Sequence, residues 1–158
     1  MEDAHEYRQV GGAPQCVHSC PSERVWEEFA SYERVNMWLG LGHRLLAYVP
    51  EVGAVADFSV SIDGRERHFG GEVLVFEPGH ELSLANNWQS ADMAWPVPMV
   101  WTFRLTAMYD GTLVEFFHHG FERLGEQAAD ELAAYESSWT SRHLLALRAE
   151  VEDAETPG

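Results

Sequence analysis

Alternation of apolar and polar residues along several neighbouring segments restricts the fold of this chain more than any other feature. Over residues 54–62 every second residue is apolar, at Ala56, Phe58, Val60 and Ile62. This period of two is typical of a half-buried β-strand. Similar patterns predict further strands over residues 65–77, 82–88, 99–107 and 112–119. Asp63-Gly64 and Asp110-Gly111 are two-residue hairpin signals, so the strands should form one antiparallel meander.

Helical periodicity occurs towards the two ends of the chain. Pro21-Ser22-Glu23 should end a first extended segment and start a short helix capped by Ser22, and a second short helix is predicted from Tyr32 to Trp38, closed by Gly40. A long helix is predicted from about Glu126 to Val151, because one stripe recurs at three- and four-residue steps: Leu132, Tyr135, Trp139, His143 and Leu147. This stripe complements the apolar face of the sheet. We expect an α+β fold in a single domain over residues 1–158, with an ordered core over about residues 10–151.

Acidic residues outnumber basic ones by 26 to 10, which gives a net charge of −16 at pH 7. A surface of this sign repels nucleic-acid phosphates and anionic lipid headgroups, so neither nucleic acid nor a membrane is an expected partner. No segment approaches the roughly 20 apolar residues of a membrane helix, and residues 1–9 lack the apolar core of a secretion signal. We therefore expect a cytoplasmic protein in which Cys16 and Cys20 are free thiols.

Several short motifs, taken together and in order, resemble a known family. They are Pro21–Phe29, Trp38, Pro50–Gly53, Gly71-Glu72-Val73, Glu77-Pro78, His118–Phe121 and Tyr135–Trp139. Over about residues 15–150 this series resembles the Hsp90-ATPase-activator-homologue group of the START/Bet v 1-like (SRPBCC) superfamily. The resemblance implies the helix-grip fold, in which a curved antiparallel sheet of about seven strands, two short helices and a long C-terminal helix enclose a cavity. Phe121–Gly125, with the Ala- and Glu-rich segment after it and Trp139, is similar to the enediyne self-resistance proteins of the calicheamicin type.

Aromatic side chains are the candidate walls of that cavity, since the chain has six Trp, eight Phe and five Tyr. Apolar cavities with a few polar groups are the usual sites for small molecules. The strand alternation and the helix stripe predict these ligand-binding residues: Trp38, Phe58, Val60, Asn86, Trp88, Trp101, Phe103, Phe116, His118, Tyr135, Trp139 and His143. Asn86 stands where the resembled group often has an aromatic residue. A solid aromatic core without a cavity is the alternative interpretation.

Few residues could carry acid–base chemistry. His118 should point towards the terminal helix and His119 away from it, because neighbours on a strand face opposite sides. His118 and Tyr135 are therefore the candidate catalytic residues, with a packed structural histidine as the alternative for His118. No metalloprotease, nucleophile-elbow, phosphate-loop or dinucleotide motif is present, and we expect no metal and no cofactor. Gly70-Gly71 inside a strand predicts a bulge or a close backbone approach.

Three functions follow as hypotheses. The first, favoured over catalysis, is binding of an apolar or polycyclic small molecule, with natural-product sequestration or self-resistance as its role. In the sacrificial mode that the calicheamicin-type resemblance implies, Gly120 and Gly125 would give up Cα hydrogens to a bound diradical. The second is a polyketide cyclase or aromatase that uses His118 or Tyr135, and the third is a module that interacts with a chaperone. An exposed Phe117 would also suit a patch shared across a homodimer.

Overall fold

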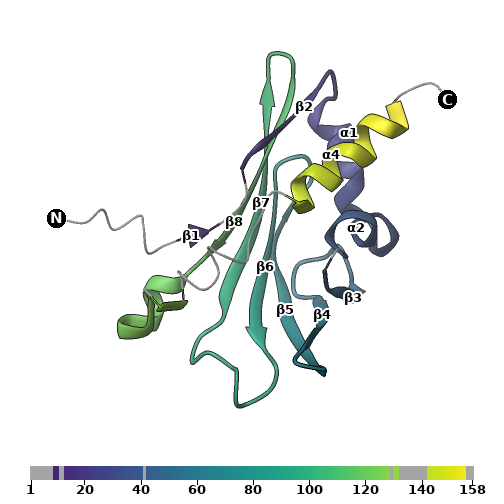
Figure 1. Cartoon of the computed structure of the whole chain (residues 1–158). Coiled ribbons are helices and arrows are strands. Elements are labelled where there is room, and N and C mark those ends of the chain that lie inside the picture. The colour runs from purple at the N-terminus through teal and green to yellow at the C-terminus, as the bar shows by residue number, and fades with distance from the viewer. Residues whose placement is uncertain (1–8, 11–12, 41, 129, 132–141, 156–158) are drawn as a thin grey trace.

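The computed structural model describes residues 9–10, 13–40, 42–128, 130–131 and 142–155. Its elements in chain order are β1 (Gln9–Val10), β2 (Gln15–His18), α1 (Ser22–Trp26), η2 (Glu27–Phe29), α2 (Tyr32–Leu39), β3 (Arg44–Tyr48), β4 (Val55–Ile62), β5 (Arg65–Glu77), β6 (Glu81–Trp88), β7 (Met99–Met108), β8 (Gly111–His119), η3 (Phe121–Gln127) and α4 (Arg142–Glu155). Figure 1 shows a curled sheet with α1, α2 and α4 together on one side of it. The predicted α+β class and helix-grip arrangement are confirmed.

All strands belong to one antiparallel sheet in the order β1-β8-β7-β6-β5-β4-β3. Both N-terminal strands pair with β8. The first half of β8 pairs with β2, and the last two residues of β8 pair with β1. Eight strands therefore occupy seven positions in the sheet, which agrees with the number expected from the sequence. The alternation did not predict β3, because only five residues with a mixed burial pattern form this edge strand.

The N-terminal helices span the residues that the sequence predicts, but the first helix begins differently from the prediction. Pro21, not Ser22, is the N-cap of α1, so the predicted serine cap is wrong. The Ser22 hydroxyl lies instead 3.3 Å from Thr112 Oγ1 of β8. At α2 the Ser31 side chain accepts a hydrogen bond from the Arg34 backbone N–H, and Gly40 ends the helix as predicted.

The predicted long C-terminal helix is described only at its two ends. Around its expected start the chain forms the 3-10 helix η3, interrupted at Gly125, where φ is 63° and ψ is −120°. Its middle, including Leu132, lies outside the described residues. The last part is α4, which continues to Glu155 rather than ending at Val151.

The hairpin at Asp63-Gly64 is confirmed, because Ile62 pairs with Arg65 across a two-residue loop. Both loop residues have a positive φ, 51° and 77°, as a type I′ turn requires. This turn sets the register of the whole β4–β5 ladder, so Phe58 lies opposite Phe69.

The predicted turn at Asp110-Gly111 is wrong by one residue. Met108 pairs with Gly111, so the loop is Tyr109-Asp110. Gly111 instead allows β2 to approach closely, since a Cβ at this position would collide with the Val17 carbonyl oxygen. The close approach predicted at Gly70 is confirmed for the same reason, because a Cβ there would collide with the Ala56 carbonyl oxygen.

The inner face of the sheet, which faces the helices, is covered at one end by α1, η2, α2 and α4 (Figure 1). The side chains buried there are Val25, Trp26, Phe29, Val35, Trp38, Leu39, Phe103, Leu105, Val114, Leu144, Leu147 and Val151. We call this group the packed end. None of the described helices is both long enough and apolar enough to cross a bilayer.

Candidate functional site

Three histidines from distant parts of the chain meet on the inner face of the sheet. His43 lies between α2 and β3, His118 lies on β8 and His143 lies in the first turn of α4. The His43 and His143 rings stack with their centroids 5.3 Å apart. The Trp101 ring lies 6.0 Å from His43 and 5.9 Å from His118, and so joins them. We call His43, Asn86, Trp101, His118 and His143 the histidine cluster.

Strand alternation explains why these polar side chains are buried. On β8 every second residue is buried, and His118 is 0% exposed, as the sequence predicts. His119 points to the outer face, where its Nε2 lies 2.8 Å from Thr102 Oγ1. On β6 Asn86 is also buried, and it pairs with Met99 of β7, which lies two residues from Trp101 on the same face of the sheet.

Burial keeps the His43 and His118 imidazoles uncharged at neutral pH. It lowers the pKa of His118 to about 3, with a smaller contribution from the neighbouring His119. It also lowers the pKa of His43 to about 4, together with repulsion from His143, although a hydrogen bond to the Leu39 backbone opposes this shift. Both rings are therefore neutral hydrogen-bonding groups in an aromatic environment.

Two atoms of the cluster are buried without a hydrogen-bond partner among the residues that the structure describes. They are Asn86 Oδ1 and His43 Nε2. The other ring nitrogen of His43 forms a hydrogen bond with the Leu39 backbone. Nε2 of the neutral ring therefore carries a lone pair and can accept a hydrogen bond. A buried polar atom without a hydrogen bond lowers the stability of the fold by about 1–3 kcal/mol, so a hydrogen-bond donor at either atom would be stabilising.

Aromatic rings pack around the His43 side of the cluster. Phe58 and Phe69 stack across the β4–β5 pair, with centroids 5.1 Å apart and planes at 7°. Trp101 lies against both rings, at 5.2 Å from Phe58 and 5.9 Å from Phe69. Trp88 lies 5.2 Å from Phe69, and His43 meets both phenyl rings edge-on. Ring faces and ring edges both take part in this packing.

The loop between β6 and β7 places a second tryptophan beside His118. The Trp95 ring lies 6.3 Å from His118, and the Phe121 ring lies 4.8 Å from it. The side-chain amide of Asn87 holds the loop: its Oδ1 accepts from the Trp95 N–H at 2.9 Å, and its Nδ2 donates to the Trp95 carbonyl at 3.1 Å. A small apolar cluster of Trp95, Met99, Phe121, Leu124 and Ala128 thus closes this side of the histidine cluster.

The packed end is built differently. Trp38 is fully buried, and its ring meets Phe29 at 5.0 Å and Phe103 at 5.3 Å. Its indole N–H donates to the Glu28 carbonyl at 3.0 Å, and the Tyr48 hydroxyl donates to the Phe29 carbonyl at 2.6 Å. The Trp38 and Tyr48 polar atoms are therefore satisfied by backbone, and the rings interlock.

A family model described as activator of Hsp90 ATPase homolog 1-like protein matches residues 19–149, most of the chain. The chain belongs to this family. Among curated proteins, none gives a significant match.

Solved structures agree with the fold of this chain. A crystal structure from Mesorhizobium loti has 24% identity and a TM-score of 0.64, over 95% of this chain and 100% of that one. DynU16, from the dynemicin biosynthetic locus, has 21% identity and a TM-score of 0.60, over 93% of this chain and 48% of that one. The Aha1 dimer from Colwellia psychrerythraea has 13% identity and a TM-score of 0.58, over 94% of this chain and 98% of that one. At these identities the likeness concerns the fold.

The structure brings together some of the predicted ligand-binding residues of this activator-homologue chain and separates others from them. Phe58, Asn86, Trp88, Trp101, His118 and His143 lie in or beside the histidine cluster, and Val60 is half-buried against the same core. Trp38 and Phe103 lie in the packed end, with Phe116 between the two regions, 4.7 Å from Phe103 and 5.8 Å from Trp101. Tyr135 and Trp139 lie outside the described residues.

Of the two glycines predicted to donate a hydrogen atom, Gly120 precedes η3 and Gly125 interrupts it. Gly120 is buried, directly follows His119 and has a φ of 99°; a Cβ there would lie 2.9 Å from the Arg123 guanidinium. Gly125 is exposed, and its φ of 63° also favours glycine. Gly120 is thus close to the histidine cluster in the chain, whereas Gly125 faces solvent.

Sequence reasoning missed His43, Phe69, Trp95 and Phe121. A signal existed for Phe69, since the Asp63-Gly64 turn places it opposite Phe58 by counting outwards from Ile62 and Arg65. His43 and Trp95 lie outside regular elements, where alternation predicts nothing about direction. Their positions follow only from the packing of the chain around β7.

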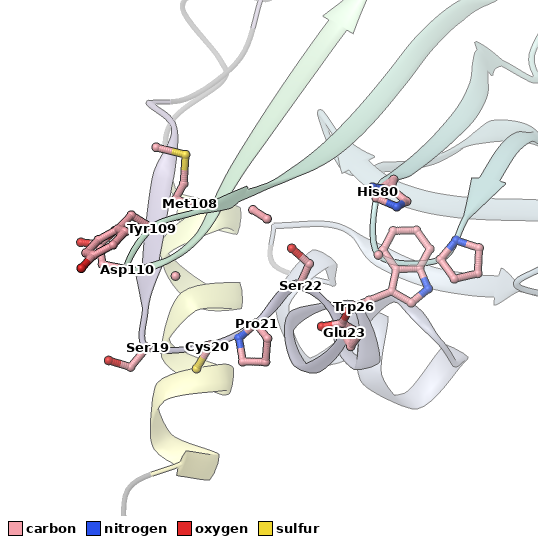
Figure 2. A pocket seen from close by; sticks show the side chains of 14 residues that line it. Ser19, Cys20, Pro21, Ser22, Glu23, Trp26, His80, Met108, Tyr109 and Asp110 are labelled. Atoms are coloured by element: carbon pink, nitrogen blue, oxygen red, sulfur yellow. The ribbon is translucent and has the colours of Figure 1, made fainter.

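A recess of about 700 Å³ lies at the other end of the sheet, away from the predicted residues. Figure 2 shows Trp26 and His80 on one side of it and Met108, Tyr109 and Asp110 of the β7–β8 hairpin on the other. Turn residues supply much of its lining, and Tyr109 is fully exposed. We favour the histidine cluster as the functional site, because its polar atoms are buried among aromatic rings, whereas this recess is open to solvent.

Proposed function

We propose that the chain binds a hydrophobic, aromatic small molecule against the histidine cluster. The observation that carries this proposal is the pair of buried acceptors, Asn86 Oδ1 and His43 Nε2, which have no partner among the described residues. The His43 ring lies beside the rings of Phe58, Phe69 and Trp101, and Asn86 lies on the same face of the sheet, paired with Met99. A ligand that stacks on these rings and donates hydrogen bonds would satisfy both atoms.

The two acceptors narrow the class of ligand. A neutral His43 and an amide oxygen both require donors, so the guest should carry hydroxyl or N–H groups on a flat, apolar frame. A carboxylate or phosphate would turn its own lone pairs towards those of the two acceptors, so the ligand group that meets these atoms should be a donor rather than an anion. Polycyclic phenols meet these requirements.

The test is a titration of the purified chain with hydroxylated naphthalenes and anthracenes, followed by tryptophan fluorescence and native mass spectrometry. We expect one molecule bound per chain, with quenching of the tryptophan emission. Asn86→Leu should weaken binding at least about tenfold, which corresponds to about 1.4 kcal/mol. Phe103→Leu, in the packed end, is the matched control and should leave the affinity unchanged. Equal loss in both variants would contradict the proposal.

Natural-product sequestration or self-resistance is the role that we propose for this binding. The fold similarity to DynU16, a protein of the dynemicin locus, and the calicheamicin-type motif at Phe121–Gly125 support it. In a sacrificial mode, a bound aryl diradical would take a hydrogen atom from a glycine Cα, forming an aryl C–H bond and a backbone radical. Dioxygen would then add to that radical, and the chain would break at Gly120 or Gly125.

Intact-mass analysis after incubation with an activated enediyne tests this role. Cleavage at Gly120 or Gly125, with transfer of deuterium from Cα-deuterated glycine to the quenched enediyne, is the expected result. An unchanged mass would remove the sacrificial mode and leave the binding proposal standing.

Catalysis of the cyclase or aromatase type is the second candidate, with His118 as its proton acceptor. The lowered pKa of His118, about 3, makes this imidazole a weak base and weighs against it, because an efficient general base has a pKa near the working pH. His118→Ala separates the two functions, because a cyclase should lose turnover far more than affinity, whereas a binding protein should lose at most modest affinity.

A homodimer and a chaperone as partners both remain predictions. The Aha1 dimer is consistent with self-association, and Phe117 on the outer face is half-buried beside Arg104, whose guanidinium carbon lies 5.5 Å from the ring. Light scattering after size exclusion tests the dimer, and a chaperone pull-down tests the third hypothesis.

A further inference from the structure

Cys16, His18 and Asp110 converge at the tip of the sheet, away from the histidine cluster. The ligand atoms that they offer, a thiol sulfur, an imidazole nitrogen and a carboxylate oxygen, all lie within 4.8 Å of one another. Cys16 and His18 are two residues apart on β2, so they point to the same side of the strand. The residue between them, Val17, is fully buried, so both side chains face outwards.

Backbone contacts hold the two contributing segments together. His18 pairs with Gly111, and the Ser19 N–H donates to the Asp110 carbonyl at 2.7 Å. Gly111 lies so close to Val17 that a Cβ would collide with its carbonyl oxygen. Figure 2 shows Asp110 at the hairpin tip, next to the strand that leads into Ser19. Residues more than ninety positions apart in sequence are thereby fixed side by side.

The distances between the ligand atoms suit an ion with tetrahedral coordination. His18 Nδ1 lies 3.4 Å from Asp110 Oδ2. Zinc bonds of about 2.0–2.2 Å to nitrogen and oxygen place two tetrahedral ligand atoms about 3.4 Å apart, so these two atoms need no rearrangement. The Cys16 sulfur lies at most 4.8 Å from the other two ligand atoms, so it would have to move closer when an ion binds. A fourth position would remain for water.

We propose that Cys16, His18 and Asp110 form a binding site for a divalent transition metal of the zinc class. Thiolate and imidazole favour Zn²⁺ over Mg²⁺ or Ca²⁺, which prefer all-oxygen sites. The net charge of −16 attracts a divalent cation to the surface. On binding, the Cys16 thiol gives up its proton to solvent and the sulfur coordinates as a thiolate. The ion would tie β2 at the edge of the sheet to the β7–β8 hairpin.

The sequence alone does not predict this site, since its obvious thiol pair is Cys16 with Cys20. Cys20 is buried and lines the recess described above, so the structure assigns Cys16 to different partners. The aspartate comes from a turn whose position the sequence predicted one residue too late.

The test is calorimetric titration of the metal-free full chain with Zn²⁺, together with absorption spectra of the Co²⁺ form. We expect one ion per chain and a sulfur-to-cobalt charge-transfer band. Loss of an outer-shell partner alone typically costs about 10–100-fold in metal affinity. Cys16→Ser, His18→Ala and Asp110→Asn should therefore each weaken Zn²⁺ binding at least about tenfold, and Cys16→Ser should abolish the charge-transfer band.

His68→Ala is the matched control, because His68 and Glu66 form another exposed histidine–carboxylate pair, 3.9 Å apart. It should bind Zn²⁺ as the wild type does. Three results would overturn the proposal: no Zn²⁺ binding by the wild type, affinity that survives all three substitutions, or an equal loss in His68→Ala. Polycyclic phenol binding at the histidine cluster should be unchanged in Cys16→Ser, so the two proposals fail independently.

Discussion

The two ends of the inner face bury aromatic side chains in different ways. At the packed end Trp38 and Tyr48 each find a backbone carbonyl, and the rings of Phe29, Trp38 and Phe103 interlock. In the histidine cluster, Asn86 Oδ1 and His43 Nε2 are buried without such a partner among the described residues. Both ends lie on the same strands, so burial alone does not distinguish a core from a binding surface.

The difference lies in how the neutral polar groups are satisfied. The packed end has one buried atom without a partner among the described residues, Glu28 Oε2, but the same carboxylate is paired through Oε1 with Arg24 and Arg34. A stable core pairs its buried polar atoms, because each unpaired one costs about 1–3 kcal/mol. A surface that receives a guest retains hydrogen-bonding capacity at the expense of stability. Substitutions at the packed end should therefore lower the stability of the protein, whereas substitutions in the histidine cluster should change its affinity for a ligand.

Trp38→Ala should produce the largest effect. Truncating a fully buried tryptophan typically costs about 3–5 kcal/mol of unfolding free energy, and the Glu28 carbonyl would also lose its donor. Urea denaturation followed by circular dichroism measures this loss. A cost below about 1 kcal/mol would show that the packed end is not the stabilising region.

Acidification should destabilise the protein through the histidine cluster. The folded-state pKa values of His118, about 3, and His43, about 4, lie below the ordinary value of 6.5. The unfolded chain therefore binds more protons below about pH 6.5, and stability falls as the pH drops towards these values. Each histidine contributes on the order of 2 kcal/mol between pH 7 and pH 5.

His118→Gln isolates one of these contributions. The free energy of unfolding, measured in urea at pH 7, 6 and 5, should fall less steeply with acid in this variant than in the wild type. Identical slopes would mean that His118 is protonated equally well in the folded and unfolded states.

Asn86→Leu should separate stability from function. The substitution removes a buried, unsatisfied oxygen and fills a similar volume, so the free energy of unfolding should rise by about 1–3 kcal/mol. Binding of a polycyclic phenol should weaken in the same variant. Thermal unfolding with and without ligand checks both effects, and a destabilised variant would indicate that Asn86 is a structural residue.

Paired phenylalanine substitutions compare the two ends with the same chemistry. Phe69→Leu beside the histidine cluster and Phe103→Leu at the packed end should each cost about 1–2 kcal/mol of stability. Only Phe69→Leu should also weaken ligand binding, as measured by fluorescence titration. Equal affinities in the two variants would remove the functional difference between the ends.

Much of the fold and part of the site were predictable because both depend on alternation. Phe58, Asn86, Trp101 and His118 were predicted to face inwards since each sits at an inward position of a regular strand. The sequence grouped Trp38 and Phe103 with the residues of the histidine cluster, whereas the structure places both in the packed end. Sequence patterns could not show this separation, because they indicate which face a residue occupies but not how far along that face it lies. The distinction requires the positions of α2 and α4 over the sheet.

The sequence by itself determined the class of fold, the antiparallel order of the strands from β4 to β8 and the faces of these strands, since period-two alternation and tight turns act locally. Tertiary structure alone decided which polar groups meet. His43 contacts His143 and Trp101, and Cys16 and His18 lie close to Asp110, although these residues belong to segments far apart in the chain. Such meetings depend on the register and curvature of the whole sheet, which no local pattern encodes.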